Sequence, residues 1–409
     1  MTKTIRIPFL KDHHSHPLFY AAFGQAIALH EVETKEEANE LLAQHANGNP
    51  DGLTIACGWR SNRFSWTQEE IEEMPPVAIF NVSLHSLMIN RQGMQVLKNR
   101  YGDIAEKMTD RVWYEHNLRV VLNWFANLYA SVEGIQAFYE SQLSQGVYYL
   151  EEMLLVDEGE INLFESAGLL SRTKFWAAPD TFESLSESAK FAVEGLKLFT
   201  DGAIGSRTAA MKRTFLNEDE ANYGMLIYTD DELARTLRGC FDIGKSLAIH
   251  AIGDRAIEQV VTHLENSGSA IDSVPVIRIE HAQMISLDQA RRAKELGVVL
   301  SMQPNLNSDS RDYSDRMDES YCAMNNPFRM LIDEAGFRAG EDLILGSDGM
   351  PHGVNAAISQ SFFPAMPSQR LTEDEFVAGY CLADESQGVI EIELDDKKVV
   401  STNVLPPQS

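Results

Sequence analysis

Short apolar runs alternate with helix-like segments from residue 146 to residue 348, and this alternation restricts the fold more than any other feature. Segments such as 230–244, 253–268 and 286–297 have the length and polarity of amphipathic helices. Strands separated by helices in this way are usually parallel. With one apolar run at the start of the chain, eight strands are predicted: 5–10, 146–155, 173–178, 195–200, 246–250, 275–281, 297–304 and 342–348.

Eight parallel strands suit a (β/α)8 barrel, the TIM-barrel architecture of the α/β class, better than an open sheet. Several polar side chains that can bind metal ions fall at the ends of these strands, where such a barrel gathers its active site. The length of 409 residues and the 44% share of apolar residues are sufficient for one large core. We therefore predict a barrel.

Two segments fall outside the alternating pattern. Residues 18 to about 145 are predicted to be mainly helical, with one strand at 77–82, and are too long for a simple connection between strands. Residues 388–394 alternate apolar and acidic side chains, as in a half-buried strand. The predicted organisation is a barrel over 1–384, with a long helical insertion at about 18–145, and a short strand segment over 385–409.

The charge of the chain restricts its partners. There are 61 acidic residues and 34 basic residues, for a formal net charge of -27, which argues against nucleic acid and membrane surfaces as partners. No apolar stretch is long enough for a membrane span or a secretion signal, and the four cysteines are far apart, as expected for reduced thiols. We expect a cytoplasmic protein that acts on a small molecule, and a homo-oligomer is compatible with the sequence.

Metal-capable residues recur at the predicted strand ends. His14 and His16 follow the first apolar run, and residues two apart on an extended chain point to the same side. Two imidazoles from one strand supply half of a zinc-type site. His250, His281 and Asp348 end three later strands. Each residue alone would be read as a polar turn or a core histidine, but together they predict a metal site.

Three further residues each have two interpretations. Lys197 lies inside the apolar strand 195–200, where a buried amine costs several kcal/mol unless it is neutralised or paired. It either reaches a rim or an acidic partner, or it belongs to the site. His85 either begins a surface helix or contacts the substrate. Arg207 either contacts the substrate or forms an ion pair that fixes the loop after strand 195–200.

The order of these residues carries a family resemblance. A His-x-His pair followed by Lys, His, His and Asp at successive strand ends resembles the amidohydrolase superfamily of metal-dependent hydrolases. The segments 197–211, 247–261, 278–286 and 343–348 are similar to the subgroup that includes N-substituted formamide deformylase. The stretch 85–90 also resembles a histidine-asparagine stretch that lies near the substrate in that family.

The resemblance implies a ligand set and a reaction. One divalent metal would be held by His14, His16 and Asp348, and a second by His250 and His281. Lys197, carboxylated by carbon dioxide, would bridge them; the alternative is a bare amine and a single metal. Zinc is the expected metal, as one ion or two. The implied reaction is hydrolysis of a non-peptide carbon–nitrogen bond, an amide or an N-acyl or N-formyl group, by metal-activated hydroxide, with Asp348 as general base and acid.

The sequence also departs from the family pattern. Only a few residues precede the first strand and the usual C-terminal signature is missing, so the β-sandwich domain of the family is expected to be reduced or absent. The segments after Gln303-Pro304 and after Asp348 are atypical. A barrel that has lost turnover and works as a binding or scaffold protein is therefore an alternative, as is a metal-dependent decarboxylase or isomerase. The presence of all six ligand positions favours the hydrolase.

Overall fold

The computed structural model describes residues 2–24, 26–30, 32–48, 52–60, 63–81, 84, 86–110, 113–114, 117–218 and 220–407. The chain forms two compact units. The first unit consists of Met1–Pro17 and Tyr139–Ser409, and the second unit is Leu18–Phe138. The second unit overlaps the predicted insertion at about 18–145.

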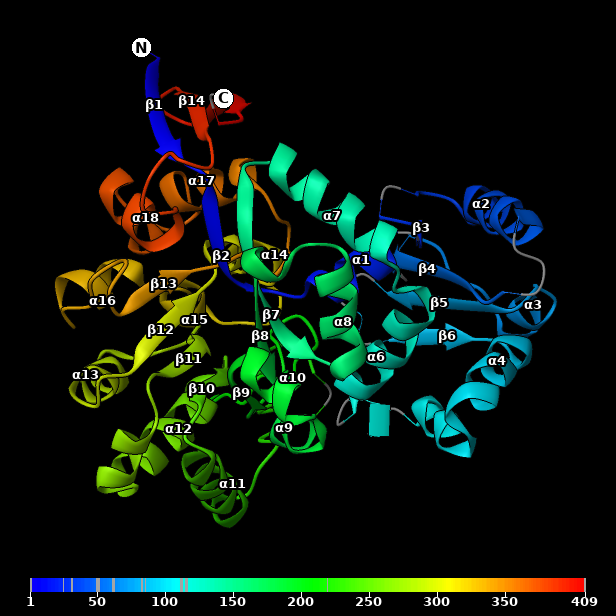
Figure 1. Cartoon of the computed structure of the whole chain (residues 1–409), viewed down its shortest axis with the longest axis horizontal. Helices are drawn as coiled ribbons and strands as arrows, with labels where there is room; N and C mark the ends of the chain where they lie inside the picture. Colours follow the sequence, from blue (N-terminus) through cyan, green and yellow to red (C-terminus); the bar gives the residue numbers. More distant parts are fainter. Residues whose placement is uncertain are drawn as a thin grey trace. The chain divides into compact units, whose positions relative to one another are not determined.

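The first unit contains a nearly closed barrel of eight strands, all parallel to their neighbours (Figure 1). The two ends of the sheet meet where the Asp348 N–H donates to the His14 carbonyl oxygen at 2.7 Å. This is the predicted barrel architecture. Its strands in spatial order are β13 (Leu343–Leu345), β12 (Val299–Met302), β11 (Ile277–His281), β10 (Ser246–Ala251), β9 (Val193–Phe199), β8 (Thr173–Ala177), β7 (Val147–Leu155) and β2 (Leu10–Ser15).

Helices follow most barrel strands and cover the outside of the barrel (Figure 1). In α12, the buried residues Ile257, Val260, Val261 and Leu264 form the inward stripe expected from their spacing. The α-helices of this unit after β7 are α8 (Glu158–Ser166), α9 (Pro179–Ser184), α10 (Glu187–Ala192), α11 (Asp230–Ile243), α12 (Asp254–Asn266), α13 (Leu287–Glu295), α14 (Asp309–Asp312), α15 (Glu319–Met324), α16 (Phe328–Asp333), α17 (Val354–Phe362) and α18 (Glu373–Tyr380). Its 3-10 helices are η2 (Leu170–Arg172), η3 (Gly268–Ser273), η4 (Pro304–Ser308) and η5 (Pro367–Gln369).

The prediction of 5–10 as the first barrel strand is wrong. Most of that run lies in β1 (Lys3–Pro8), which pairs antiparallel with β14 (Val389–Leu394) in a separate three-stranded sheet. The first barrel strand is β2, whose sequence Leu-Lys-Asp-His-His-Ser is mostly polar. Its polar side chains have polar partners, such as Glu151 for His13 and Glu280 for His14, so hydrophobic patterning does not reveal the strand.

The C-terminal segment completes this small sheet, in the order β1–β14–β15, with β15 (Val399–Leu405) at its edge. Ile390 and Ile392 of β14 are fully buried, and Glu391 and Glu393 lie between and after them at less buried positions. The alternation in 388–394 therefore does mark a strand with one buried face.

The second unit is less helical than predicted, because it contains a four-stranded sheet in the order β3–β4–β5–β6. Ile79 of β5 belongs to one apolar cluster and its neighbours Ala78 and Phe80 belong to another, so the strand faces two cores. The elements are α1 (Pro17–Phe23), β3 (Ile27–Ala28), α2 (Lys35–Gly48), β4 (Thr54–Trp59), α3 (Gln68–Glu72), β5 (Val77–Asn81), β6 (Leu87–Ile89), α4 (Arg91–Tyr101), η1 (Asp103–Thr109), α6 (Leu118–Tyr129) and α7 (Val132–Ser144), which continues into the first unit.

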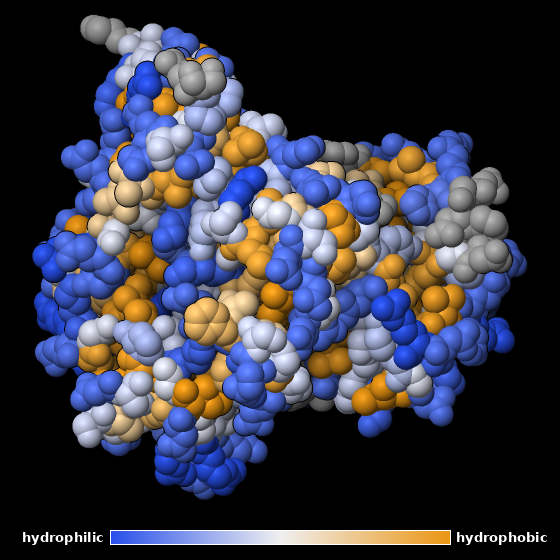
Figure 2. Space-filling view, viewed as in Figure 1, coloured by the Kyte–Doolittle hydropathy of each residue, from blue (hydrophilic) through white to orange (hydrophobic). Residues whose placement is uncertain are grey.

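The surface in Figure 2 is mostly hydrophilic, with hydrophobic residues in scattered patches. Within the described part of the chain, no helix combines the length and the hydrophobicity needed to span a membrane.

Candidate metal centre

The two histidines at the first barrel strand converge on Asp348. His14 lies in β2 and His16 follows it. The Oδ1 atom of Asp348 is 3.8 Å from Nε2 of His14 and 3.2 Å from Nε2 of His16. Asp348 has a left-handed backbone, with φ +55°. The structure therefore places these three residues close together, and their sharing of one metal stays a prediction.

His281 joins this group through an unusual backbone conformation. Glu280 and His281 are consecutive residues at the end of β11, and in a regular strand their side chains would point to opposite sides. His281 instead has φ +68°, so that both side chains reach His14. Oε2 of Glu280 is 2.6 Å from Nδ1 of His14, and the His281 and His14 ring centroids are 4.6 Å apart. Such conformations cost about 1–3 kcal/mol and are concentrated at functional sites.

The resulting cluster has the dimensions of a metal site. One ligand atom from each of His14, His281 and Asp348 lies within 4.8 Å of the other two. His250, at the end of β10, lies beside them, with its ring centroid 4.5 Å from that of His281. His14 and His281 are buried, whereas the Asp348 side chain is 19% exposed, which leaves one side of the cluster open to solvent.

Three of the histidines have one ring nitrogen occupied by a protein acceptor. Nδ1 of His14 donates to Glu280, and Nδ1 of His281 donates to Oε1 of Gln303 at 2.7 Å. Nε2 of His250 donates to the carbonyl oxygen of Gly202 at 3.1 Å. Metal-binding histidines are usually held in this way, which fixes the tautomer. The nitrogens left for a metal are Nε2 of His14 and His281 and Nδ1 of His250.

The protonation states fit metal ligands. Burial lowers the pKa of His14 to about 4 and lowers the pKa of His281 well below its ordinary value, so both are neutral at pH 7. Burial also opposes charge on His16, but Asp348 and Glu152 outweigh it and raise the pKa of His16 to about 9. Burial disfavours the Asp348 carboxylate, yet His16 and His14 lower the pKa of Asp348 below its ordinary range. Metal binding at His16 would therefore release a proton.

Lys197 is buried next to the cluster, with 1% of its surface exposed. Among the described residues, its Nζ atom has no hydrogen-bond partner; it lies 5.1 Å from the centroid of the Phe199 ring. Burial lowers the pKa of Lys197 to about 8. The lysine does not reach a rim and forms no ion pair with a described residue, and an orphaned buried amine of this kind fits a group that is modified or bound to metal.

The two predicted substrate contacts have different outcomes. His85 lies outside the described residues. Arg207 is ion-paired: its Nε atom is 2.9 Å from Oε1 of Glu218, and its Nη2 atom is 3.8 Å from Oδ2 of Asp315. These contacts support the alternative interpretation, in which Arg207 fixes the loop after β9. Asn90, in the same motif as His85, caps α4 and is fully buried.

The sequence analysis missed the residues that hold the histidines. Glu280 and Gln303 are fully buried, and Glu280 is bonded to Arg278, which is also buried. One signal was available, because Arg278 and Glu280 are charged residues at alternate positions of an otherwise apolar strand. Charged side chains on one face of a buried strand require partners, so we would expect them to point into the barrel and to pair with charges on other strands.

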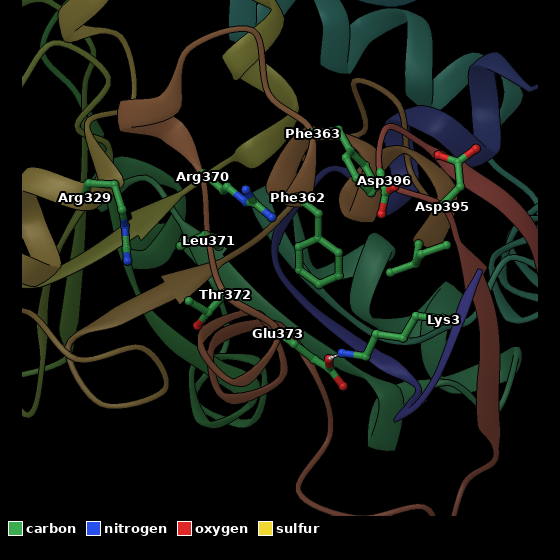
Figure 3. Close-up of a pocket in the computed structure, with 11 residues that line it drawn as sticks. Lys3, Arg329, Phe362, Phe363, Arg370, Leu371, Thr372, Glu373, Asp395 and Asp396 are labelled. Atoms are coloured by element: carbon green, nitrogen blue, oxygen red, sulfur yellow. Dashed lines mark hydrogen bonds and ion pairs between the residues drawn. The ribbon is translucent and has the colours of Figure 1, made fainter. Parts of the chain in front are cut away.

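A pocket elsewhere in the first unit is not part of this cluster. It encloses 510 Å³ next to the small sheet, and none of the eleven residues that line it is a candidate ligand (Figure 3). Its charged residues are largely paired, as in Lys3–Glu373, or bonded outside the pocket, as in Arg329–Glu375.

Comparison with known proteins assigns the family. The amidohydrolase family model matches residues 7–355. The chain therefore belongs to the amidohydrolase family. It is 30% identical over 166 residues to the Bacillus subtilis (strain 168) protein YtcJ, covering 40% of this chain and 31% of YtcJ. It is 23% identical over 355 residues to Protein LONG AFTER FAR-RED 3 of Arabidopsis thaliana, covering 75% of this chain and 60% of that protein. The chain thus spans less than two thirds of each curated relative.

Two solved structures share the fold. Uncharacterized metal-dependent hydrolases from Pyrococcus horikoshii OT3 and Pyrococcus furiosus each superpose with a TM-score of 0.66, at 22% and 18% sequence identity. The first match covers 91% of this chain and 78% of the other, and the second covers 99% and 88%.

Proposed function

We propose that the protein is a metal-dependent hydrolase that cleaves a non-peptide carbon–nitrogen bond, an amide or an N-acyl or N-formyl group, in a small molecule. The observation that carries this proposal is the convergence of His14, His281 and Asp348 at the C-terminal ends of the barrel strands in a chain of the amidohydrolase family. The resemblance of segments 197–211 and 247–261 to formamide deformylases supports the choice of bond.

The ligand set fits one or two divalent ions. His14, His16 and Asp348 would hold one ion, and His250 and His281 would hold a second. Zinc is the proposed metal, because neutral imidazoles and a carboxylate suit it. When bound, such an ion supplies Lewis acidity to the substrate carbonyl and lowers the pKa of water at the site.

Asp348 is the proposed general base and acid. Its carboxylate is ionised and is the most exposed member of the cluster of three, so water and substrate can reach it. One oxygen accepts the proton of the attacking water, and the same group then delivers that proton to the leaving nitrogen. His16, at 3.2 Å, keeps the carboxylate oriented.

Lys197 is proposed to be carboxylated. Its lowered pKa increases the fraction of uncharged amine at neutral pH, and the uncharged amine is the form that attacks the carbon of carbon dioxide and then loses a proton. The product is an anion, which removes the repulsion between an ammonium group and metal ions. The remaining alternative is a bare amine beside a single metal.

The setting of this activity is also a proposal. We place the protein in the cytoplasm, with a small-molecule substrate and without nucleic-acid or membrane partners. The net charge of -27 supports the expected lack of nucleic-acid and membrane partners, because it repels polyanions. Association into a homo-oligomer is compatible with it.

A panel of N-formyl and N-acyl amides tests the reaction. Zinc-loaded protein should hydrolyse at least one member, and Asp348→Asn should lower kcat about 10²–10⁴-fold, the usual contribution of a general base. Glu385→Gln is the control, because Glu385 pairs with Arg6 at the surface. Absence of turnover with every amide would favour the binding or scaffold reading, and release of carbon dioxide from a carboxylated substrate would favour a decarboxylase.

A further inference from the structure

A buried ion network crosses the interior of the barrel beside the candidate ligands. Arg278 of β11 donates from Nη1 to Oε2 of Glu151 in β7 at 2.6 Å, although three strands separate β11 from β7 in the sheet. It also donates from Nε to Oε1 of Glu280 at 2.7 Å, and from Nη2 to the carbonyl oxygen of His13 at 2.7 Å and Oγ of Ser301 at 3.0 Å. The contacts therefore span the barrel.

The two carboxylates of this network have different second partners. Glu151 accepts from Nε1 of Trp176 at 2.8 Å and is 2.8 Å from Nδ1 of His13, and neither residue is a candidate ligand. Glu280 uses its second oxygen for Nδ1 of His14. Of these two carboxylates, Glu280 is therefore the one that links Arg278 to a candidate ligand.

We propose that Glu280 is a positioning residue that holds His14 with its proton on Nδ1 and its Nε2 atom directed at the metal. This inference rests on the proposed function. A carboxylate can only accept from the imidazole, so the 2.6 Å contact determines the tautomer of a neutral His14. Arg278 in turn fixes the orientation of Glu280 by bonding its other oxygen.

The geometry leaves His14 little freedom. The side chain is 1% exposed, and the backbone of the residue is bonded on both sides, its N–H to Asp12 and its carbonyl oxygen to the N–H of Asp348. Turning the ring over would leave an oxygen of Glu280 buried without its donor, which is unfavourable for a charged group. The site is therefore preorganised before metal arrives.

The network also supplies charge. Among the described residues, the ion pairs of this network join one cation, Arg278, to two anions, Glu151 and Glu280, so one negative charge is in excess within the pairs. Part of that charge faces His14 and makes the lone pair of Nε2 a stronger ligand for a metal ion, as carboxylates behind metal-bound histidines do. A buried anion of this kind stabilises a cation on the opposite side of the ring.

A matched pair of variants tests the proposal. Glu280→Gln and Glu151→Gln each keep the size of the side chain and each remove one charge beside Arg278, but only the first changes a contact of His14. The zinc dissociation constant, measured by competition with a chelator, should rise about 10–100-fold in Glu280→Gln. Glu151→Gln should stay close to the wild type, even if both variants lose thermal stability.

Two results would overturn this role: wild-type zinc affinity in Glu280→Gln, or an equal loss of affinity in both variants. Failure of the wild type to bind zinc would instead remove the proposed function, so the two failures are distinguishable.

A measurement on the unmodified protein covers the case in which Glu280→Gln does not fold. In zinc-loaded wild type labelled with ¹⁵N-histidine, long-range ¹H–¹⁵N correlations report which ring nitrogen carries the proton. The His14 resonances, assigned through the backbone, should show a protonated Nδ1 and a zinc-bound Nε2. Zinc on Nδ1 would contradict the proposal.

Discussion

At the scale of single residues, Lys197 and Glu280 are buried charges in opposite situations. Glu280 has a partner at each oxygen, and Arg278 and His14 outweigh the effect of burial to lower its pKa well below the ordinary value. Lys197 has no hydrogen-bond partner among the described residues, and burial lowers its pKa to about 8. A buried carboxylate with two partners needs no further ligand, whereas a buried amine without one does. Of these two residues, Lys197 is therefore the one whose buried amine still requires a modification or a ligand.

Lys197→Ala should abolish amide hydrolysis, and acetate or propionate should partly restore it by taking the place of the carbamate between the metals. The measurement is kcat with and without the added acid, and the wild type, which should not respond, is the control. A crystal structure that showed a bare amine at Lys197 with both metals present would contradict the assignment.

Asp309 provides a pH prediction outside the site. Burial raises its pKa to about 7, although Gln283 donates to it at 2.7 Å. Its pKa is higher in the folded than in the unfolded chain, so the protonated form favours folding, and this stability is lost as pH rises from 4 towards 7. Asp309→Asn keeps the hydrogen bond without the charge. It should raise Tm at pH 8 by about 1 °C for each kcal/mol gained, because the entropy of unfolding of a chain of 409 residues is large.

The same substitution at pH 4 should leave Tm close to that of the wild type, because Asp309 is then protonated. A gain that is equal at pH 4 and pH 8 would show that the charge of Asp309 is not responsible.

Single residues also show how far the sequence predicts the site. Lys197, His250, His281 and Asp348 could be identified because each interrupts or ends an apolar strand. Gln303 could not, because its role depends on an imidazole from the neighbouring strand. Patterning along one strand carries no information about what a side chain meets on another strand.

At the scale of elements, hydrophobic patterning located most barrel strands and misassigned the first. β1 reads as a strand because Ile5 and Ile7 are buried on one side of it, but they lie opposite Ile392 and Ile390 of β14 in the small sheet. β2 is polar because its side chains enter the charged part of the barrel, such as His13 beside Glu151. β2 therefore lacks the apolar pattern that revealed β9, β10 and β11, although all four strands carry candidate ligands.

The small sheet predicts a stability effect. Truncation after Ser386 removes β14 and β15, which exposes Ile5 and Ile7 of β1 and deletes the buried Ile390 and Ile392. Thermal unfolding should then occur at a clearly lower temperature. The point variant Ile392→Ala alone should cost about 2–5 kcal/mol, and Glu393→Ala, on the less buried face, is its matched control.

An unchanged Tm in the truncated protein would show that this sheet contributes nothing to the barrel's stability.

At the scale of the whole molecule, all six candidate ligands belong to the first unit, which contains residues up to Pro17 and from Tyr139 onwards. The second unit has two apolar clusters of its own and contributes no candidate ligand from its described residues. Of its four strands the sequence indicated only β5; β4 has 6 residues and was missed as well, whereas β3 and β6 have only 2 and 3 residues. Such strands are too short for periodicity to be detected.

The central claim is that these residues hold metal, and the metal content of the purified protein tests it most directly. The wild type should contain one or two zinc ions per chain by elemental analysis, and His14→Ala combined with His16→Ala should lose the ion held with Asp348. Replacing His45 and His263, which lie on α2 and α12, removes the same number of histidines and should leave the metal in place. Unchanged metal content in the His14 and His16 double variant would contradict the account.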